Sequence, residues 1–312
     1  MNKTELLNMT NEERKAIIDQ AIEARRVRNM RPEEVRTATR AAEKIAAGER
    51  ITVPEFEALT GVMFSHHMTG KMLNILGLST SCFSNPVCLA RLKAGIGICA
   101  DCFAASLETR YGGTFENTSY NAEILSGSVL PLDVLPIIDA DELRIESFGD
   151  TANWQQAANY MNMARQNPTV AVTAWTKNPN HYLQAIRRGY SKPANFTLIL
   201  SSQEKNQPQE VRPEYMAIID KRFTVYTLDW LDHNGHDHSF INCGGRSCKT
   251  CQRCYMKART TGFDVRELLK SDAQKAAKNR GGAWAVWSDE VAEEQPERVQ
   301  KAARDILALF GK

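Results

Sequence analysis

Residues 143–226 alternate between short apolar stretches and longer amphipathic ones, and this alternation restricts the fold more than any other feature. We expect strands at 143–147, 169–175, 195–200 and 222–226, with helices over 153–166 and 180–188 between them. Strand–helix–strand units at this spacing require parallel pairing through right-handed crossovers. The strand centres are apolar, as expected when both faces of a sheet are covered. The sequence therefore predicts an α/β fold with a parallel βαβ core, either an open sheet or a partial or complete (β/α) barrel.

The regions on either side of this segment have helical patterns. Near the N-terminus, Thr10 and Glu13 form a capping-box pattern, Pro32 stands at a first-turn position, and Gly61 follows a third short helix. The expected parts are a helical N-terminal region over 1–60, an α/β metal-binding core over 61–262 and a helical C-terminal extension over 263–312. The helices expected outside residues 1–60 and 143–226 are 119–125, 264–278 and 297–310.

The eight cysteines fall into two groups of four. The first quartet is Cys82, Cys88, Cys99 and Cys102, and the second quartet is Cys243, Cys248, Cys251 and Cys254. The sequence has neither the roughly 18-residue apolar run that spans a bilayer nor an apolar signal segment at its N-terminus. We therefore expect a cytoplasmic protein without a membrane partner, in a compartment where disulfides are rare. Two four-ligand metal sites account for all eight thiols.

The second quartet has a spacing that favours an iron–sulfur cluster over zinc. Zinc sites usually take their thiolates from two separated C-x2-C hairpins. Here three cysteines follow one another as C-x2-C-x2-C, a spacing found in ferredoxin-type cluster loops. Gly244 and Gly245 allow backbone amides to approach cluster sulfides. Cys243 then supplies the fourth ligand.

The first quartet has a spacing that tolerates either metal, and its pairing with the second quartet favours iron–sulfur slightly. A cysteine from one quartet can also complete the metal site of the other. The C-x3-C-x2-C loop of radical S-adenosylmethionine enzymes does not occur, and neither quartet leaves an open iron unless one of its cysteines does not ligate. We expect one or two [4Fe-4S] clusters, with Zn²⁺ as the alternative.

Polar residues follow the expected strands, at the end where parallel α/β folds bind their ligands. Glu146 interrupts an apolar strand and needs a partner if it points inward, for which Arg144 and Lys177 are candidates. Asp150 suits either a site role or the N-cap of the next helix. We take Glu146, Asp150 and Lys177 as the candidate catalytic residues. The histidines near the quartets are candidate ligands, proton donors or substrate contacts, or parts of solvated loops: His66, His67, His233, His236 and His238.

Several of these motifs resemble the gene-product-88-type family of phage, plasmid and other mobile-element proteins. The shared stretches lie within roughly residues 60–265 and are CADCF at 99–103, RIESFGD at 144–150, WTK at 175–177 and CGGRSCKTCQRCY at 243–255. In relatives the first motif often reads Cys-Tyr-Ala, where this chain has Phe103. The resemblance implies a cysteine-ligated metalloprotein on an α/β or partial-barrel core. It implies no reaction, because the family's activity is unassigned.

These observations predict an iron–sulfur protein that performs redox or radical-type chemistry on a polar small molecule or a nucleic acid. Such chemistry implies an electron donor as a partner. The alternative is a zinc-stabilised mobile-element protein that binds nucleic acid or protein without catalysis. In that case the basic N-terminal helices would make the contact, through Arg25, Arg26, Arg28 and Arg31. A solvated helix face explains the same arginines. The formal net charge of +2 gives no global argument for nucleic-acid binding.

Overall fold

The structure is a computed structural model. It describes residues 3–272 apart from 27, 29, 67, 69, 245–246, 257–261 and 270. The expected helix over 297–310 and most of the C-terminal extension lie outside the described residues. None of the helices in the described part is long and apolar enough to cross a membrane.

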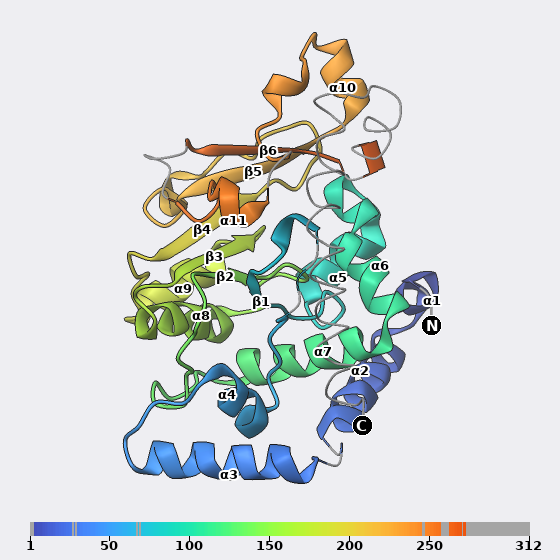
Figure 1. Ribbon diagram of the computed structural model, residues 1–312. Helices are drawn as coiled ribbons and strands as arrows, with labels where there is room; N and C mark the ends of the chain where they lie inside the picture. The colour runs from blue at the N-terminus through green and yellow to red at the C-terminus, as the bar shows by residue number, and fades with distance from the viewer. Residues whose placement is uncertain are drawn as a thin grey trace, which may run out of the picture.

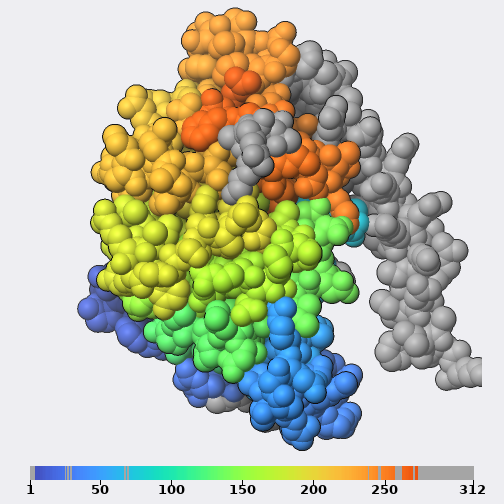
Figure 2. All heavy atoms as spheres, turned by 90° about the vertical axis from the view of Figure 1, so that its left-hand side faces the viewer, coloured from blue at the N-terminus to red at the C-terminus, as the bar shows by residue number. Residues whose placement is uncertain are grey.

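The N-terminal region is helical, as the sequence predicts. Its helices are α1 (Lys3–Asn8), α2 (Asn11–Arg26), α3 (Pro32–Ala46) and α4 (Val53–Thr60). The capping box before α2 is confirmed, because the Thr10 amide donates to Glu13 at 2.8 Å and the Glu13 amide donates to Thr10 Oγ1 at 3.1 Å. Gly61 ends α4 in the left-handed conformation, with φ at 76°. In Figures 1 and 2 these helices form one end of the molecule.

The core is one six-stranded sheet in which every neighbouring pair is parallel. The strands stand side by side in chain order, and their bounds are β1 (Leu76–Leu78), β2 (Glu142–Ile145), β3 (Ala171–Thr176), β4 (Phe196–Ser201), β5 (Lys221–Tyr226) and β6 (Asp264–Leu268). The prediction of a parallel βαβ core is confirmed. Sequential order is also the order of strands in a (β/α) barrel.

Strand β6 corrects the helix that was expected over 264–278. Residues 264–268 pair in parallel with β5, from Arg222 beside Asp264 to Tyr226 beside Leu268. The two buried residues of β6, Val265 and Leu268, are three positions apart, a spacing that fits a helix as well as a twisted edge strand. The α/β core therefore continues past residue 262.

Residues 62–127 contain more regular structure than the single helix expected at 119–125. The short strand β1 is followed by α5 (Pro86–Ala94), the 3₁₀ turn η2 (Gly97–Asp101), α6 (Phe103–Arg110) and α7 (Gly112–Gly127). Asn85 and Pro86 begin α5, and the Asn85 side chain accepts the amides of Val87 and Cys88. Further along the chain lie η3 (Pro213–Tyr215), α10 (Leu228–His233), η4 (His238–Phe240) and α11 (Cys248–Cys251).

The two faces of the sheet have different coverings. Helices α8 (Trp154–Gln166) and α9 (Asn180–Arg187) pack on one face, where Val172 and Leu198 belong to the same apolar core as Tyr160 (Figure 1). Side chains at alternate positions point to the opposite face. There the Thr173 hydroxyl donates to the carbonyl of Cys254 at 3.0 Å, so the second cysteine loop lies against the sheet.

The two edge strands are connected by a side chain rather than by strand pairing. Lys71, in the turn η1 (Gly70–Met72) before β1, forms an ion pair with Glu267 of β6. Its ammonium group also lies 3.5 Å from the Cys243 sulfur. Cys243 in turn donates its amide to Arg266 of β6 at 2.9 Å. Lys71 therefore joins the first strand, the last strand and the second cysteine loop.

Gly149 provides a test of how the strand ends fit together. Its φ is +69°, and an added Cβ would meet the carbonyl oxygen of Thr80. We expect Gly149→Ala to lower the free energy of unfolding by about 3 kcal/mol, from left-handed backbone strain together with this clash. Gly189→Ala is the control, because φ is +93° there and the added Cβ meets nothing within 4 Å. Urea unfolding of both variants measures the difference, and equal losses would contradict this packing.

Candidate metal centre and adjoining cavity

The first quartet lines one side of a cavity of about 470 Å³. Cys82 lies after β1, Cys88 within α5, Cys99 within η2, and Cys102 just before α6. The Cys82 and Cys102 thiols are hydrogen-bonded to each other, and Cys88 and Cys99 are close enough to interact electrostatically with Cys102. All four thiols therefore line one cavity, but within the described part of the chain no three of them are arranged to hold a metal ion, so the predicted four-ligand site stays a prediction.

The four thiols differ in how readily they lose a proton. Burial raises the pKa of Cys82 and Cys88 well above the ordinary value of a thiol. The pKa of Cys102 is lowered to about 6, first by a hydrogen bond from Cys82 and then, against burial, by the amides of Ala104 and Ala105 at the start of α6. Cys102 is therefore the thiol of the quartet that ionises most readily.

The cavity lies at the carboxyl ends of the strands. Glu146 and Asp150 follow β2 and Lys177 follows β3, and all three line the cavity with the first quartet. The Lys177 charge lowers the thiol pKa of Cys99 and Cys102, although burial leaves the pKa of Cys99 raised overall. The side chain of Lys177 has no hydrogen bond or ion pair with the described residues. The structure therefore brings the candidate catalytic residues and the first quartet to one site.

Asp150 holds neighbouring strand ends together and does not cap α8. Its carboxylate accepts the Thr151 amide and the Lys177 amide, each at 2.8 Å, and its carbonyl accepts the Asn85 side chain at 2.7 Å. The N-cap of α8 is Asn153, whose side chain accepts the Gln156 amide at 3.0 Å. Asp150 is only 4% exposed. Its carboxyl group thus fixes the backbone of Lys177 beside the quartet.

Glu146 has neutral partners, so the expectation that Arg144 or Lys177 would pair with it is wrong. Its carboxyl group receives hydrogen bonds from Tyr160, Gln156, and both the amide and the hydroxyl of Thr80. These contacts join the end of β2 to α8 and to the segment after β1. Glu146 also has a φ of +57°, a strained value for a residue with a side chain. The surrounding contacts hold it there.

The second quartet lines a separate and much smaller space of about 20 Å³. Cys248 and Cys251 lie in α11, Cys243 forms a parallel bridge with Glu267, and Cys254 lies over β3. The Gln252 side chain reaches Glu142 at the start of β2. The loop therefore sits inside the curve of the sheet, further from the strand ends than the first quartet.

Positive and hydrogen-bonding groups surround the second quartet. Lys71 and Arg144 lower the pKa of Cys248 and Cys254, while burial raises both values overall. The Arg144 guanidinium stacks over the Trp175 ring, with its carbon 3.8 Å from the ring centroid. Within the described part of the chain, Arg144 Nε and Tyr255 Oη are buried donors with no hydrogen-bond partner. A cysteine-ligated centre carries negative charge, and these groups fit beside one.

The described residues include no group of three or more His, Cys, Asp and Glu side chains arranged to hold a metal ion. Of the candidate histidines, His66 pairs with Glu57 at 2.8 Å, and His236 stacks on Trp230 and Phe240.

Three of the four N-terminal arginines are already paired with carboxylates: Arg26 with Glu23 and Glu123, and Arg28 and Arg31 with Glu34.

Sequence reasoning missed several residues that shape the site. Lys71 and Glu267 form the ion pair that connects the two edges of the sheet, and Glu108 accepts hydrogen bonds from Ser81 and Thr118 beside Cys82. Burial raises the pKa of Glu108 to about 7. Lys71 is 196 positions from Glu267, and Glu108 is 27 positions from Ser81, so no local pattern indicates either contact.

Comparisons of the chain with protein-family models, curated proteins and solved structures find no match. The resemblance to the gene-product-88-type family therefore stays a prediction. The chemistry of the site has to be argued from the residues that line it.

Glu146 gives the stability of the protein a specific pH dependence. Burial raises its pKa to about 8, against hydrogen bonds from Tyr160 and Thr80 that lower it, whereas an unfolded glutamate titrates near about 4.3. Between these values the folded state binds one more proton, so the free energy of unfolding falls as pH rises, by up to about 1.4 kcal/mol per pH unit.

Glu146→Gln cannot titrate, and we expect it to flatten this dependence between about pH 5 and pH 8. Urea unfolding followed by circular dichroism at several pH values measures the slope. Glu43→Gln, on an exposed position of α3, is the control and should leave the slope unchanged. A Glu146→Gln slope equal to that of the unmodified protein would show that Glu146 is ionised in the folded state.

Proposed function

We propose that the protein is an iron–sulfur enzyme that performs redox or radical-type chemistry on a polar small molecule. The observation that carries this proposal is that the first quartet lines the same cavity as Asp150 and Lys177, at the carboxyl ends of the strands. A cavity of about 470 Å³ has the size of a small-molecule site. Ligands of parallel α/β folds bind at this end of the strands.

The donor set fits an iron–sulfur cluster. Four thiols line the cavity, one of them with a pKa near 6, and Lys177 supplies a positive charge beside them. When bound, a cluster would supply electron transfer or direct activation of the substrate. Asp150 would hold the Lys177 backbone in place, and the Lys177 ammonium would orient a polar or negatively charged group of the substrate.

The second quartet supports two assignments. Its C-x2-C-x2-C spacing supports a second cluster. The space between its side chains is about 20 Å³, which has room for about one water-sized particle and favours a single structural Zn²⁺. In either case the loop stabilises the inner face of the sheet, and an external electron donor would supply the first quartet.

Two matched substitutions test these assignments. We expect Cys99→Ala to lose the iron and acid-labile sulfide of the first quartet, because the substitution removes one of the four thiolates that would hold the cluster. Cys251→Ala should lose a second portion of iron and sulfide if the second quartet holds a cluster, or zinc alone if it holds a single ion. Metal and sulfide analysis of anaerobically purified protein measures both. A Cys99→Ala variant with its iron and sulfide undiminished would overturn the proposal.

A further inference from the structure

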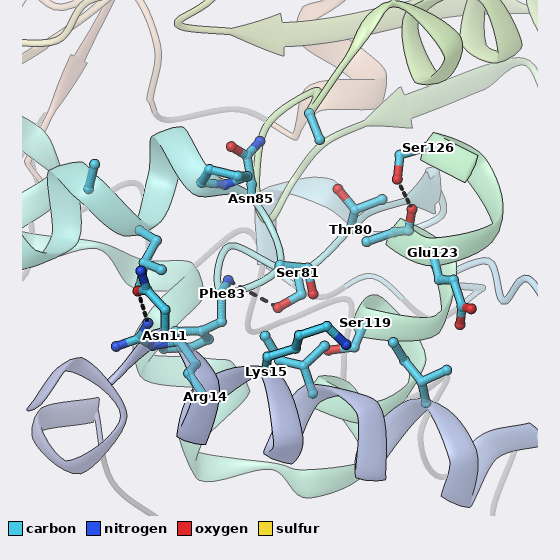
Figure 3. Close-up of a pocket in the computed structure, with 18 of the residues that line it drawn as sticks. Asn11, Arg14, Lys15, Thr80, Ser81, Phe83, Asn85, Ser119, Glu123 and Ser126 are labelled. Carbon is cyan, nitrogen blue, oxygen red and sulfur yellow. Dashed lines mark hydrogen bonds between the residues drawn. The ribbon is translucent and has the colours of Figure 1, made fainter. Parts of the chain in front are cut away.

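A second cavity, of about 560 Å³, lies away from both quartets. It is enclosed by α2, α5 and α7 and by the segment from Thr80 to Pro86, and it contains no cysteine (Figure 3). None of the candidate catalytic residues lines it. Its size is that of a small-molecule site.

Arg14 of α2 lines this cavity and carries a buried positive charge. The residue is only 2% exposed. Its guanidinium donates to the carbonyls of Leu6 and Met9 at 3.0 and 2.6 Å and to the Asn11 side chain at 3.2 Å, all of which are neutral acceptors. No carboxylate among the described residues pairs with it. A buried charge without a counter-charge is costly, so a bound anion would be strongly favoured here.

Two hydroxyl groups in the lining are also without partners. Ser119 Oγ and Ser84 Oγ are buried atoms that form no hydrogen bond with the described residues, and Ser119 is 0% exposed. Each hydroxyl can both donate and accept a hydrogen bond. Figure 3 shows Ser119 and Lys15 among the residues that line the cavity. A ligand with an acceptor atom would satisfy these groups.

The charge of the lining is positive. Besides Arg14, Lys15 and Lys93 line the cavity. Lys15 forms an ion pair with Asp19, and the one lining carboxylate among the described residues, Glu123, is bound to Arg26 at 2.9 Å. Ile18, Ile22 and Leu89 supply an apolar wall. The lining therefore offers positive charge, free hydroxyls and aliphatic surface in one space.

We propose that this cavity binds a small organic anion. Its carboxylate or phosphate would lie near Arg14 and Lys93, and its carbon body would pack against Ile18, Ile22 and Leu89. An oxygen of the same molecule would accept a hydrogen bond from the Ser119 hydroxyl. This site is independent of any metal and of the reaction at the first quartet.

The site is adjacent to the first quartet through one shared segment. Thr80, Ser81, Phe83 and Asn85 line the second cavity, while Cys82 between them lines the first. Asn85 also begins α5, the helix that carries Cys88. A ligand bound behind this segment would therefore pack against the chain that positions two of the four thiols.

Calorimetric titration of the full-length protein with octanoate and, separately, with adenosine monophosphate tests the proposal. The two probes distinguish a carboxylate on an aliphatic chain from a phosphate on a ring body. We expect one of them to bind saturably at one site per chain, with an affinity that weakens as salt is added. Absence of saturable binding by both probes would overturn the proposal.

Matched variants locate the bound probe without altering Arg14, which also fixes α1 to α2. Lys93→Glu should raise the dissociation constant roughly tenfold by reversing a charge at the cavity, and Ser119→Val should raise it severalfold by removing the hydroxyl. Arg187→Glu, on an exposed position of α9, is the control. Circular dichroism confirms that each variant is folded. Binding unchanged in both cavity variants would place the probe elsewhere and contradict the proposed site.

Discussion

Two buried carboxyl groups, those of Glu146 and Asp150, hold together the segments that follow the first three strands. Glu146 connects the end of β2 to Thr80 after β1 and to α8. Asp150 accepts the Lys177 amide after β3, and its carbonyl accepts the Asn85 side chain at the start of α5. Cys82 and Cys88 of the first quartet lie on the segment that Thr80 and Asn85 fix. The placement of these two thiols therefore depends on hydrogen bonds made by Glu146 and Asp150, which are almost inaccessible to solvent.

The parts of the fold that have long, repeated patterns could be predicted from the sequence. Strands β2–β5 are apolar runs separated by amphipathic helices, and a parallel sheet follows from that spacing. Strand β1 is only three residues long, too short to show a period. Strand β6 has buried residues at 265 and 268, and whether they form a helix or a strand is decided by the unpaired edge of β5. That edge is a tertiary feature which no local pattern records.

The sequence predicts which residues belong to the candidate site better than it predicts their hydrogen-bond partners. Cysteine spacing identified two quartets, and the rule that ligands bind beyond strand ends identified Asp150 and Lys177 as candidates. Only the structure shows that these two residues line a cavity with the first quartet. The partners of Glu146 could not be foreseen, because Tyr160, Gln156 and Thr80 are neutral and lie on other elements. The burial of Arg14 could not be predicted from the sequence either, because it depends on how α1 folds back on α2. Long-range contacts of this kind require the three-dimensional structure.

Three spaces of different size and lining occur in the described part of the molecule. The first quartet faces an open cavity, the second quartet lies inside the curve of the sheet, and a third space behind Thr80–Pro86 has the charge of an anion site. The central claim is that the first quartet holds an iron–sulfur cluster. Iron and acid-labile sulfide in the anaerobically purified, unmodified protein test it most directly. The account predicts brown protein with iron and sulfide in comparable amounts, and colourless protein that contains zinc and no sulfide would contradict it.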